Sequence, residues 1–399
     1  MYVRLESGDI HKLQGKEVLL FGAGSLGLRS IEECNKINAK ILGFIDNNRD
    51  KRGSRLEGYT IYSPEDIKSF PEAYVLITST YVKEIKVQLA NMGIKKVEVI
   101  CLGALRDKIE PDKFFRPLIS AQECNEYLYE ELQKNNPFFA GRLGSNELEC
   151  MVEHYYMLGR DRQDMKEGWK SYHNNLKLTM RQGAGFFPTE DRYLDRFVKL
   201  YTDNLKNIDF IWSMWLSRFE DMLYKRFAPE KEIGIYNDTA LPYNFSRPWT
   251  KALEGKRVLV IHPFEKSIKQ NYQIRTKLHT NPDVLPEFEL ITLKSIQSIA
   301  DETVPFKDWF EALESMKERM ARIDFDVALI GAGAYGFPLG AFAKKIGKKA
   351  LHIGGMLQLY FGIRGKYYDQ FRYHNSYWTR PLEEERPKGF EKVEAGRYW

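Results

Sequence analysis

A glycine-rich turn between an apolar strand and a helix occurs twice in this sequence, and it limits the folds open to the chain more than any other feature. The letters VLLFGAGSLG span residues 18–27, and the letters IGAGAYGFPLGAFAKKIGKKALHIGG span residues 330–355. Each stretch reads as a strand, a glycine loop and a helix, the unit from which parallel α/β sheets are built. The sequence therefore predicts an α/β protein with two Rossmann-like domains and mainly parallel sheets.

Strands and helices alternate regularly over residues 16–105. Strand-like apolar runs are KEVLLFGAG, AKILGFIDNN, AYVLITST and KKVEVICLG, and segments with helical periodicity separate them. We assign residues 1–106 to a Rossmann-like accessory nucleotide-binding domain. Residues 107–136 read as a connecting segment followed by a helix, and we assign them to a linker helix.

Residues 137–399 form the second predicted domain. The letters PFFAG read as part of a turn that leads into an amphipathic helix, and residues 161–255 read as a helical segment rich in polar and aromatic side chains. At least four strands follow, in KRVLVIH, FELITL, DVALIG and KALHIGG. The loops after these strands carry the most distinctive residues. Ligands of parallel sheets bind at the carboxyl ends of the strands, so we look for the site in these loops.

The charge balance excludes some classes of partner. The chain has 60 basic and 55 acidic residues, a net charge of +5 that is spread along the sequence and is not typical of nucleic-acid binding. No run of about 18 apolar residues is present to span a membrane. The first residues, MYVRLESGDIHKLQGK, lack the apolar core of a signal peptide, so we expect a cytoplasmic protein.

The first glycine loop has the G-x-G-x-x-G spacing of nucleotide-binding turns, at Gly22, Gly24 and Gly27. Asp46 ends the next strand, roughly 20 residues on, where a ribose-binding acid belongs. Two interpretations stay open: a working site for NAD or another nucleotide, or glycines that serve only the turn.

The same spacing recurs in the second domain, at Gly331, Gly333 and Gly336. The next strand ends in HIGG, residues 352–355, without an acidic residue, so an ordinary NAD site does not fit. Two neighbouring glycine turns suggest that both loops approach one bulky phosphorylated ligand. The alternative is that they are tight turns and nothing more.

Two further loops carry candidate chemistry. His262 ends an apolar strand, where a histidine either contacts the ligand or packs, and the segment after it contains Ser267 and Arg275, which could bind a pyrophosphate or a sugar. In GRLGSNELE, Arg142 and Glu147 flank a short turn before a helix. Glu147 is either a first-turn acid favoured by the helix dipole or a group that holds a metal or an acceptor hydroxyl.

Four blocks of the second half resemble the GT-D-type glycosyltransferases of bacterial surface-polysaccharide and glycoprotein assembly. These blocks are FAGRLGSNELE, KRVLVIHPFEKSIKQNY with the later LPEFELITLKSIQS, DFDVALIGAGAYGFPLGAFAKKIGKKALHIGGMLQLYFGIRGKYY, and EAGRYW. The resemblance covers about residues 136–399. It implies a Rossmann-like domain of GT-D type that moves a sugar from a nucleotide donor, typically a UDP-sugar, to an acceptor glycan or glycolipid.

The resemblance also implies site residues. The family's R-x-G-D-G-E-like loop falls on Arg142, Gly144, Ser145, Asn146 and Glu147. The family's metal-associated pair is Asp-x-Glu, and here Ser145 stands at the Asp position. A hydroxyl is a far poorer ligand than a carboxylate for Mn²⁺ or Mg²⁺, so metal binding at Glu147 is in doubt.

The predicted site combines these loops. Its candidate catalytic residues are Glu147 as the base, His262 as the second choice of base, and Arg142. The candidate donor-binding residues are Gly144, Ser145, Asn146, Ser267, Arg275, Gly331, Gly333, Tyr335, Gly336, His352, Gly354, Gly355 and Gln358.

The first domain resembles the small nucleotide-binding domains appended to sugar-modifying enzymes, in its GFIDNN segment. One rival function is an NAD-dependent oxidoreductase or epimerase acting on a sugar nucleotide, although no Tyr-x-x-x-Lys pair follows the first domain. Another rival is a non-catalytic scaffold that binds a nucleotide sugar, which the loss of the Asp at Ser145 favours.

Overall fold

The computed structural model describes residues 10–79, 82–99, 114–157, 167–300, 302–370, 373–393 and 396–399. The chain divides into two compact units. The first consists of Met1–Lys108 and Arg160–Asn175, and the second of Ile109–Gly159 and Leu176–Trp399.

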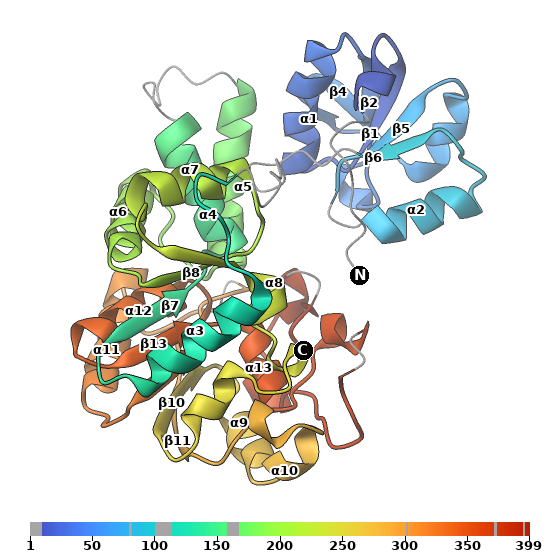
Figure 1. The fold of residues 1–399 in the computed structure, drawn as a ribbon. Coiled ribbons are helices and arrows are strands. Elements are labelled where there is room, and N and C mark those ends of the chain that lie inside the picture. The colour runs from blue at the N-terminus through green and yellow to red at the C-terminus, as the bar shows by residue number, and fades with distance from the viewer. Residues whose placement is uncertain are drawn as a thin grey trace. The chain divides into compact units, whose positions relative to one another are not determined.

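The first unit is a three-layer α/β structure. Its sheet, within the described residues, has the order β3-β4-β2-β1-β5-β6, and the short edge pair β3–β4 is antiparallel whereas the other pairs are parallel. The helices α1 and α2 pack in separate hydrophobic clusters on the two faces of this sheet (Figure 1). The bounds are β1 Glu17–Phe21, α1 Ser25–Lys36, β2 Lys40–Ile45, β3 Arg55–Leu56, β4 Tyr59–Tyr62, β5 Tyr74–Ile77, α2 Val82–Asn91 and β6 Val97–Val99.

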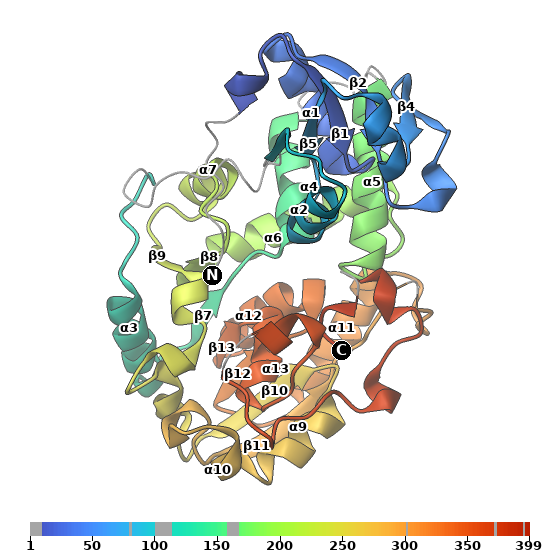
Figure 2. The same ribbon diagram turned by 90° about the vertical axis from the view of Figure 1, so that its right-hand side faces the viewer.

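The second unit is built on a larger sheet, whose described strands all pair in parallel. The order is β11-β10-β12-β13-β7-β8-β9, and Figure 2 shows β13, β12, β10 and β11 in succession. The strands are short, and all except the edge strand β11 are largely buried, as expected for a parallel sheet covered on both faces. Their bounds are β7 Phe138–Gly141, β8 Phe210–Ser213, β9 Glu232–Ile235, β10 Arg257–His262, β11 Glu289–Lys294, β12 Val327–Ile330 and β13 Lys349–His352.

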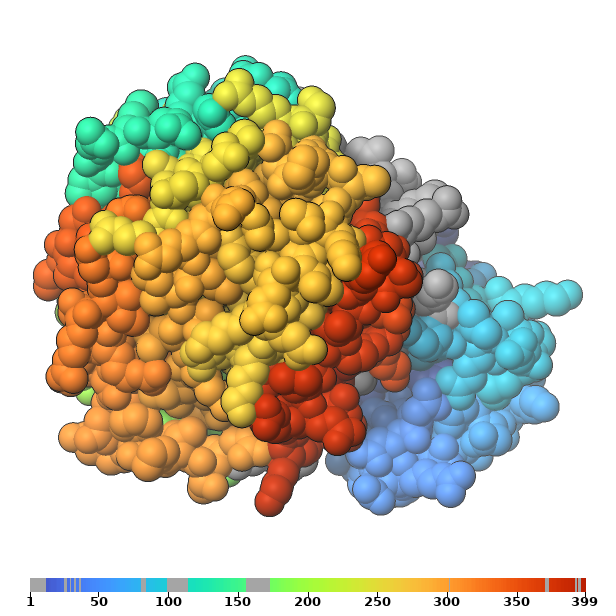
Figure 3. Space-filling view, turned by 90° about the horizontal axis from the view of Figure 1, so that it is seen from below, coloured from blue at the N-terminus to red at the C-terminus, as the bar shows by residue number. Residues whose placement is uncertain are grey.

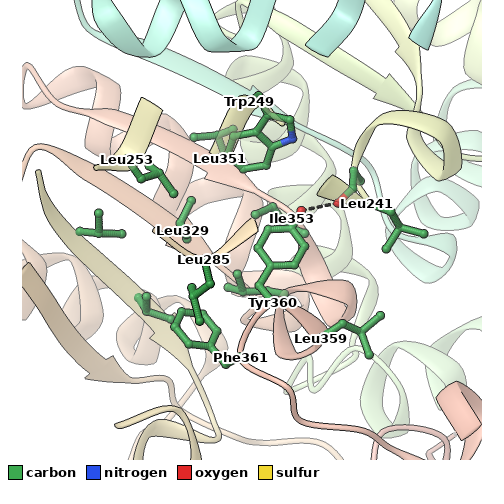
Figure 4. Packing of buried hydrophobic residues seen from close by; sticks show 14 of the residues in the cluster. Leu241, Trp249, Leu253, Leu285, Leu329, Leu351, Ile353, Leu359, Tyr360 and Phe361 are labelled. Carbon is green, nitrogen blue, oxygen red and sulfur yellow. Dashed lines mark hydrogen bonds between the residues drawn. The ribbon is translucent and has the colours of Figure 1, made fainter. Parts of the chain in front are cut away.

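Helices cover both faces of this sheet. One face packs against α3, α9 and α13 in a large apolar cluster, part of which Figure 4 shows around Trp249 and Tyr360, whose hydroxyl donates to the Ala240 carbonyl. The other face packs through aromatic side chains against α6, α11 and α12. The bounds are α3 Ala121–Gln133, α4 Ser145–Val152, α5 Glu167–Gln182, α6 Asp191–Lys206, α7 Arg218–Phe227, α8 Tyr236–Thr239, α9 Glu265–Tyr272, α10 Arg275–Leu278, α11 Trp309–Ala321, α12 Gly336–Lys345 and α13 Leu357–Tyr360.

The predicted fold class, two Rossmann-like domains with mainly parallel sheets, is confirmed. The sequence analysis missed β7, which it read as a turn, and also β8 and β9, which lie in the segment read as helical. The domain boundaries stay a prediction; α3, from the assigned linker, contributes Cys124, Leu128 and Leu132 to the core of the second unit. Nowhere in the described ranges does a helix have the length and apolar character needed to cross a membrane.

Candidate functional site

The strand order of the second sheet locates its ligand-binding position. The chain leaves β10 toward β11 on one side, and it leaves β12 toward β13 on the other. Because such crossovers are right-handed, the helices that follow, α9 and α12, lie on opposite faces, and the neighbours β10 and β12 form the switch point of the sheet. Ligands of open α/β sheets bind outside the carboxyl ends of the strands at this point.

Predicted residues from four neighbouring strands meet at this edge. A Cβ atom placed on Gly331, after β12, would lie 2.6 Å from Cδ2 of His262, the last residue of β10, and 2.9 Å from the carbonyl oxygen of Gly354, after β13. Gly354 in turn packs against the guanidinium of Arg142, which follows β7. The structure therefore brings His262, Gly331, Gly354 and Arg142 into one continuous row.

Arg142 is held in a fixed position by groups that sequence reasoning did not identify. Its Cζ atom lies 4.9 Å from the centre of the Tyr236 ring, and Nη1 lies 3.0 Å from Sδ of Met214. Its Nε donates to the carbonyl of Ile353 at 3.4 Å, and the hydroxyl of Tyr236 donates to the same carbonyl. Aromatic and thioether contacts orient a guanidinium without neutralising it, so the charge stays available to an anion.

The start of α4 carries the other part of the predicted loop. Glu147 is buried (7% exposed), and its carboxylate folds back over Gly144, so a Cβ atom at Gly144 would collide with it. Ser145 and Asn146 are half-buried, and none of the described residues forms a hydrogen bond with either side chain. A carboxylate, a hydroxyl and an amide are thus presented together at the first turn of a helix.

His262 is a neutral hydrogen-bonding group. Its Nδ1 accepts the backbone N–H of Phe264 at 3.0 Å, which places the ring proton on Nε2, the nitrogen nearer Gly331. Burial lowers the pKa of His262 to about 3. A histidine with so low a pKa is a weak base, and at neutral pH it acts as a hydrogen-bond donor through Nε2.

His352 lies beside this row and is also neutral. Its ring packs against Gly336 at the start of α12, and Nδ1 is buried without a hydrogen-bond partner in the described part of the chain. Burial, together with the positive charge of Arg142, lowers the pKa of His352 to about 3. The ring therefore fills space against the glycine turn, and Gly336 is required for that contact.

Because these two histidines are buried in the neutral form, we expect the protein to lose stability in mild acid. Both pKa values fall from 6.5 to about 3 on folding, so between these pH values the unfolded chain binds more protons than the folded one. Stability contributed by the neutral rings is complete above pH 6.5 and decreases as the pH falls. At pH 5 each histidine should lower the free energy of unfolding by about 2 kcal/mol relative to its value above pH 6.5.

Urea unfolding at pH 7 and pH 5 measures this effect. The variants His262→Gln and His352→Gln should each lose less stability than the unchanged protein between the two pH values. An identical loss in all three proteins would mean that other groups cause the acid sensitivity.

Several predicted donor-binding residues are engaged elsewhere within the second unit. Ser267 binds the carboxylate of Glu385 through its hydroxyl and its amide, the latter at 3.1 Å, and the amide of Lys266 binds the same carboxylate at 2.6 Å. Glu385 comes from the C-terminal segment, which lies alongside the yellow and orange part of the unit in Figure 3. The amino end of α9, a typical position for a phosphate, is therefore filled by a carboxylate of the protein itself.

Three other predicted residues serve packing. The Tyr335 hydroxyl bonds to Ser298 at 2.9 Å while its ring stacks on Trp309. The Gln358 amide donates to the carbonyls of Ile363 and Tyr398, at 3.3 and 3.2 Å. The Tyr398 ring also packs against Gly355, so this turn faces the C-terminal segment.

Arg275 lies away from the row. Its guanidinium pairs with Glu287 at 2.6 Å, and Glu287 lies two residues before the start of β11. This pair therefore sits at the amino ends of the strands, on the opposite edge of the sheet from Arg142. The structure does not bring Arg275 to the candidate site.

The donor set at this site does not fit a divalent cation well. Glu147 supplies one carboxylate, and Ser145 supplies a hydroxyl at the position that the resemblance associates with a second. In the described ranges no three His, Cys, Asp or Glu side chains come close enough to hold a metal ion. Mn²⁺ and Mg²⁺ prefer several carboxylate or carbonyl oxygens, so we derive no step through a metal.

The glycine loop of the first unit closes on itself. Gly22 adopts φ +127°, and a Cβ atom there would lie 2.6 Å from the Thr78 carbonyl oxygen, because the loops after β1 and β5 are in contact. Gly27 similarly faces the Gly22 carbonyl, whereas Gly24 has open space before it among the described atoms. Two of the three glycines, Gly22 and Gly27, are thus needed because a side chain there would collide with the backbone of the turn.

Asp46 is bound within this loop. Its Oδ2 accepts the amide of Ala23 at 3.0 Å and pairs with Nζ of Lys51 at 3.1 Å, and Oδ1 accepts the amide of Asn48. Lys51 also donates to the Ala23 carbonyl at 2.9 Å. A ribose could reach this carboxylate only in competition with these contacts, so a nucleotide site here stays a prediction.

Sequence reasoning missed one buried carboxylate near the site. Glu220, on α7, is fully buried and accepts hydrogen bonds from the end of β8, from the loop after β8 and from α7 itself. The donors are Ser213 Oγ at 2.8 Å, the amides of Met214 and Trp215 at 3.0 Å, the amide of Ser217 at 3.3 Å and Tyr224 Oη at 3.3 Å. The only signal in the sequence was the capping-box pattern S-x-x-E at 217–220.

Comparisons with known proteins add a family match for the first unit. Residues 14–100 match the family described as C2185-like, N-terminal. A search of curated proteins finds no match to the chain.

Two solved structures show weak likenesses. UDP-D-quinovosamine 4-dehydrogenase from Vibrio fischeri is 29% identical over an alignment that covers 21% of this chain and 75% of that one, with a TM-score of 0.18. PH0766 from Pyrococcus horikoshii OT3 is 11% identical, with 88% and 96% of the chains covered and a TM-score of 0.19. At these TM-scores neither likeness carries an argument about this chain.

Proposed function

We propose that the second unit is a glycosyltransferase that moves a sugar from a nucleotide-sugar donor, a UDP-sugar, to an acceptor glycan or glycolipid. The observation that carries the proposal is the row of His262, Gly331, Gly354 and Arg142 across the carboxyl ends of β10, β12, β13 and β7. This row places the guanidinium of Arg142 next to the glycine backbone, at the position where parallel sheets bind ligands. The sequence resemblance to GT-D-type enzymes points in the same direction.

In this proposal Arg142 stabilises the departing nucleoside diphosphate. Bond cleavage at the anomeric carbon puts negative charge on the leaving phosphate, and a fixed guanidinium is already oriented to meet it. The amides of Gly333 and Ala334 add donors, because the first N–H groups of a helical turn have no partner within that turn. The amino end of α9 does not take part, since Glu385 fills it.

Glu147 is the proposed base. It lies on the first turn of α4, and its charge interacts with that of Arg142. A carboxylate there accepts the proton of the acceptor hydroxyl as the hydroxyl oxygen attacks the anomeric carbon. Neutral His262, a weak base, is better suited to donate a hydrogen bond to the donor through Nε2.

One alternative keeps a specific observation in its favour. Ser145 stands where the resemblance places a catalytic carboxylate. A non-catalytic scaffold that binds a nucleotide sugar would tolerate the loss of that carboxylate. The oxidoreductase alternative is less favoured, because Asp46 is bound by Ala23 and Lys51 rather than left for a ribose. Donor binding without turnover would support the scaffold.

The first test is calorimetric titration of the protein with UDP, with and without Mn²⁺, followed by a screen of UDP-sugars for turnover. We expect UDP to bind, with little dependence on Mn²⁺. Absence of UDP binding would contradict the proposal. Binding strengthened by Mn²⁺ would show that the site holds a metal despite Ser145.

Glu147→Ala should lower the transfer rate by about 10²–10⁴-fold while leaving the dissociation constant of UDP nearly unchanged, because a general base contributes this much. The matched control is Glu123→Ala. Glu123 is the third residue of α3, as Glu147 is of α4, and its carboxylate accepts the amide of Ser120. The control should lose some stability and no activity. Full activity of Glu147→Ala would remove Glu147 from the mechanism.

A further inference from the structure

A short loop that the proposed mechanism does not use lies beside the candidate site. Gly183, Ala184 and Gly185 follow the end of α5 and stand between the first turn of α4 and the glycine turn after β12. A Cβ atom on Gly183 would lie 2.7 Å from Nδ2 of Asn146, and the Ala184 carbonyl oxygen lies 4.0 Å from the Cβ position of Gly333. The loop therefore touches the site from two sides.

This loop is rigidly anchored. The amide of Gly183 donates to the Thr179 carbonyl at 2.8 Å, and the amide of Phe186 donates to the Met180 carbonyl at 2.9 Å. On its other side, the hydroxyl of Ser298 donates to the Gly185 carbonyl at 2.6 Å. A backbone fixed in this way can present its remaining polar groups in a defined geometry.

Two polar groups beside the candidate site, the Ala184 carbonyl and the Asn146 amide, have no hydrogen-bond partner among the described residues. Within the described part of the chain, no group donates to the Ala184 carbonyl, although Ala184 is buried at 4% exposure. The Asn146 amide likewise forms no hydrogen bond there. The space before Gly333 is open apart from the Ala184 carbonyl oxygen, in the same ranges. A buried carbonyl without a donor is uncommon unless a ligand or water satisfies it.

We propose that Asn146 and the 183–185 loop form the wall that recognises the hydroxyl groups of the transferred sugar. This inference rests on the proposed function and names the part of the donor that the wall contacts. An amide both donates and accepts, and a carbonyl accepts, which matches the two roles of a sugar hydroxyl. Gly183 and Gly185 allow the loop to pack closely here, because Cβ atoms at these positions would lie 2.7 Å from Nδ2 of Asn146 and 2.9 Å from Oγ of Ser298. The space that we assign to the sugar is the open region before Gly333.

The experiment measures sugar discrimination separately from nucleotide affinity. Dissociation constants are determined by calorimetry for UDP and for UDP-glucose, UDP-galactose, UDP-N-acetylglucosamine and UDP-N-acetylgalactosamine. In Asn146→Ala, the preference for the best of these sugars over UDP should fall about tenfold, the value of roughly one hydrogen bond to a buried group. The UDP constant itself should stay within about twofold.

Gly183→Ala provides the second arm. Its added methyl group would press on the Asn146 amide, so the variant should also lose sugar preference, but it should have no further effect in an Asn146→Ala background. Gln122→Ala, exposed on α3, is the control and should leave every constant unchanged. Circular dichroism and the UDP constant show whether each variant is folded.

The outcomes separate the inference from the proposed function. If UDP binds and the sugar preference is unchanged in Asn146→Ala, the inference is wrong and the proposed function stands. If the unchanged protein binds all four UDP-sugars no better than UDP, the wall recognises no sugar and the inference is again wrong. If UDP does not bind, both are wrong.

Discussion

Replacing Arg142 by alanine is expected to lower kcat/KM for sugar transfer by about 10²–10³-fold, the cost of removing one fixed electrostatic group from a leaving-group site. The guanidinium lies at the carboxyl end of β7, against Gly354 and above the ring of Tyr236. In the proposed mechanism it is the cation of the row that binds the diphosphate, so both the affinity for UDP and the turnover rate should fall. Steady-state kinetics and calorimetry with UDP measure the two effects.

Two variants sharpen this prediction. Arg142→Lys keeps the charge but loses the planar contact with Tyr236 and the reach to the Ile353 carbonyl, so it should recover only part of the activity. Arg275→Ala removes an arginine at the opposite edge of the sheet and should leave kcat/KM unchanged. If Arg275→Ala were the damaging variant, the site would have been placed at the wrong end of the strands.

The parts of the fold that could be predicted share one property. The strands β1, β2, β10 and β12 are apolar runs that end in or are followed by glycine, aspartate or histidine, and both signals are visible in the sequence itself. In contrast, β8 and β9, with the sequences FIWS and EIGI, lie on either side of the amphipathic helix α7, in a segment that reads as helical. Their strand state comes from pairing, of β8 with β7 and of β9 with β8, which no local pattern reveals.

The candidate site was predictable to the extent that it depends on backbone. Glycine loops at strand ends identify Gly331, Gly333 and Gly354, because a parallel sheet puts all its carboxyl ends on one edge. Whether a polar side chain faces this edge depends on tertiary partners. Ser267 is bound by Glu385 from a segment 118 residues later in the chain, and Arg275 is drawn to the amino ends by Glu287. Neither partner could be inferred from spacing.

The groups that orient Arg142 illustrate the same limit. Tyr236 and Met214 follow β9 and β8, the strands that the sequence analysis missed, so their contribution to the site could not be foreseen. The loop that carries Met214 is in turn shaped by Glu220, whose carboxylate accepts its amides. Errors in the predicted strands therefore led directly to omissions in the predicted site.

Glu220→Ala is expected to lower the unfolding free energy of the second unit by about 3–5 kcal/mol, because it leaves buried donors without an acceptor. The affected groups are the Ser213 hydroxyl and the amides of Met214 and Trp215, all at the carboxyl end of β8. Urea unfolding followed by tryptophan fluorescence measures the change. This signal reports mainly on the second unit, since every tryptophan except Trp169 lies there.

The same variant also tests whether stability and function are coupled through this loop. Releasing the amides of Met214, Trp215 and Ser217 should loosen the contact of Met214 with Arg142, so the affinity for UDP should fall even where the variant is still folded. Glu220→Gln keeps the size but offers the loop one acceptor oxygen in place of two, and its effects should be intermediate. Glu126→Ala, on the exposed side of α3, is the control and should change stability by no more than about 0.5 kcal/mol. A Glu220→Ala protein as stable as the unchanged one would mean that water replaces the carboxylate and that this network does not hold the loop.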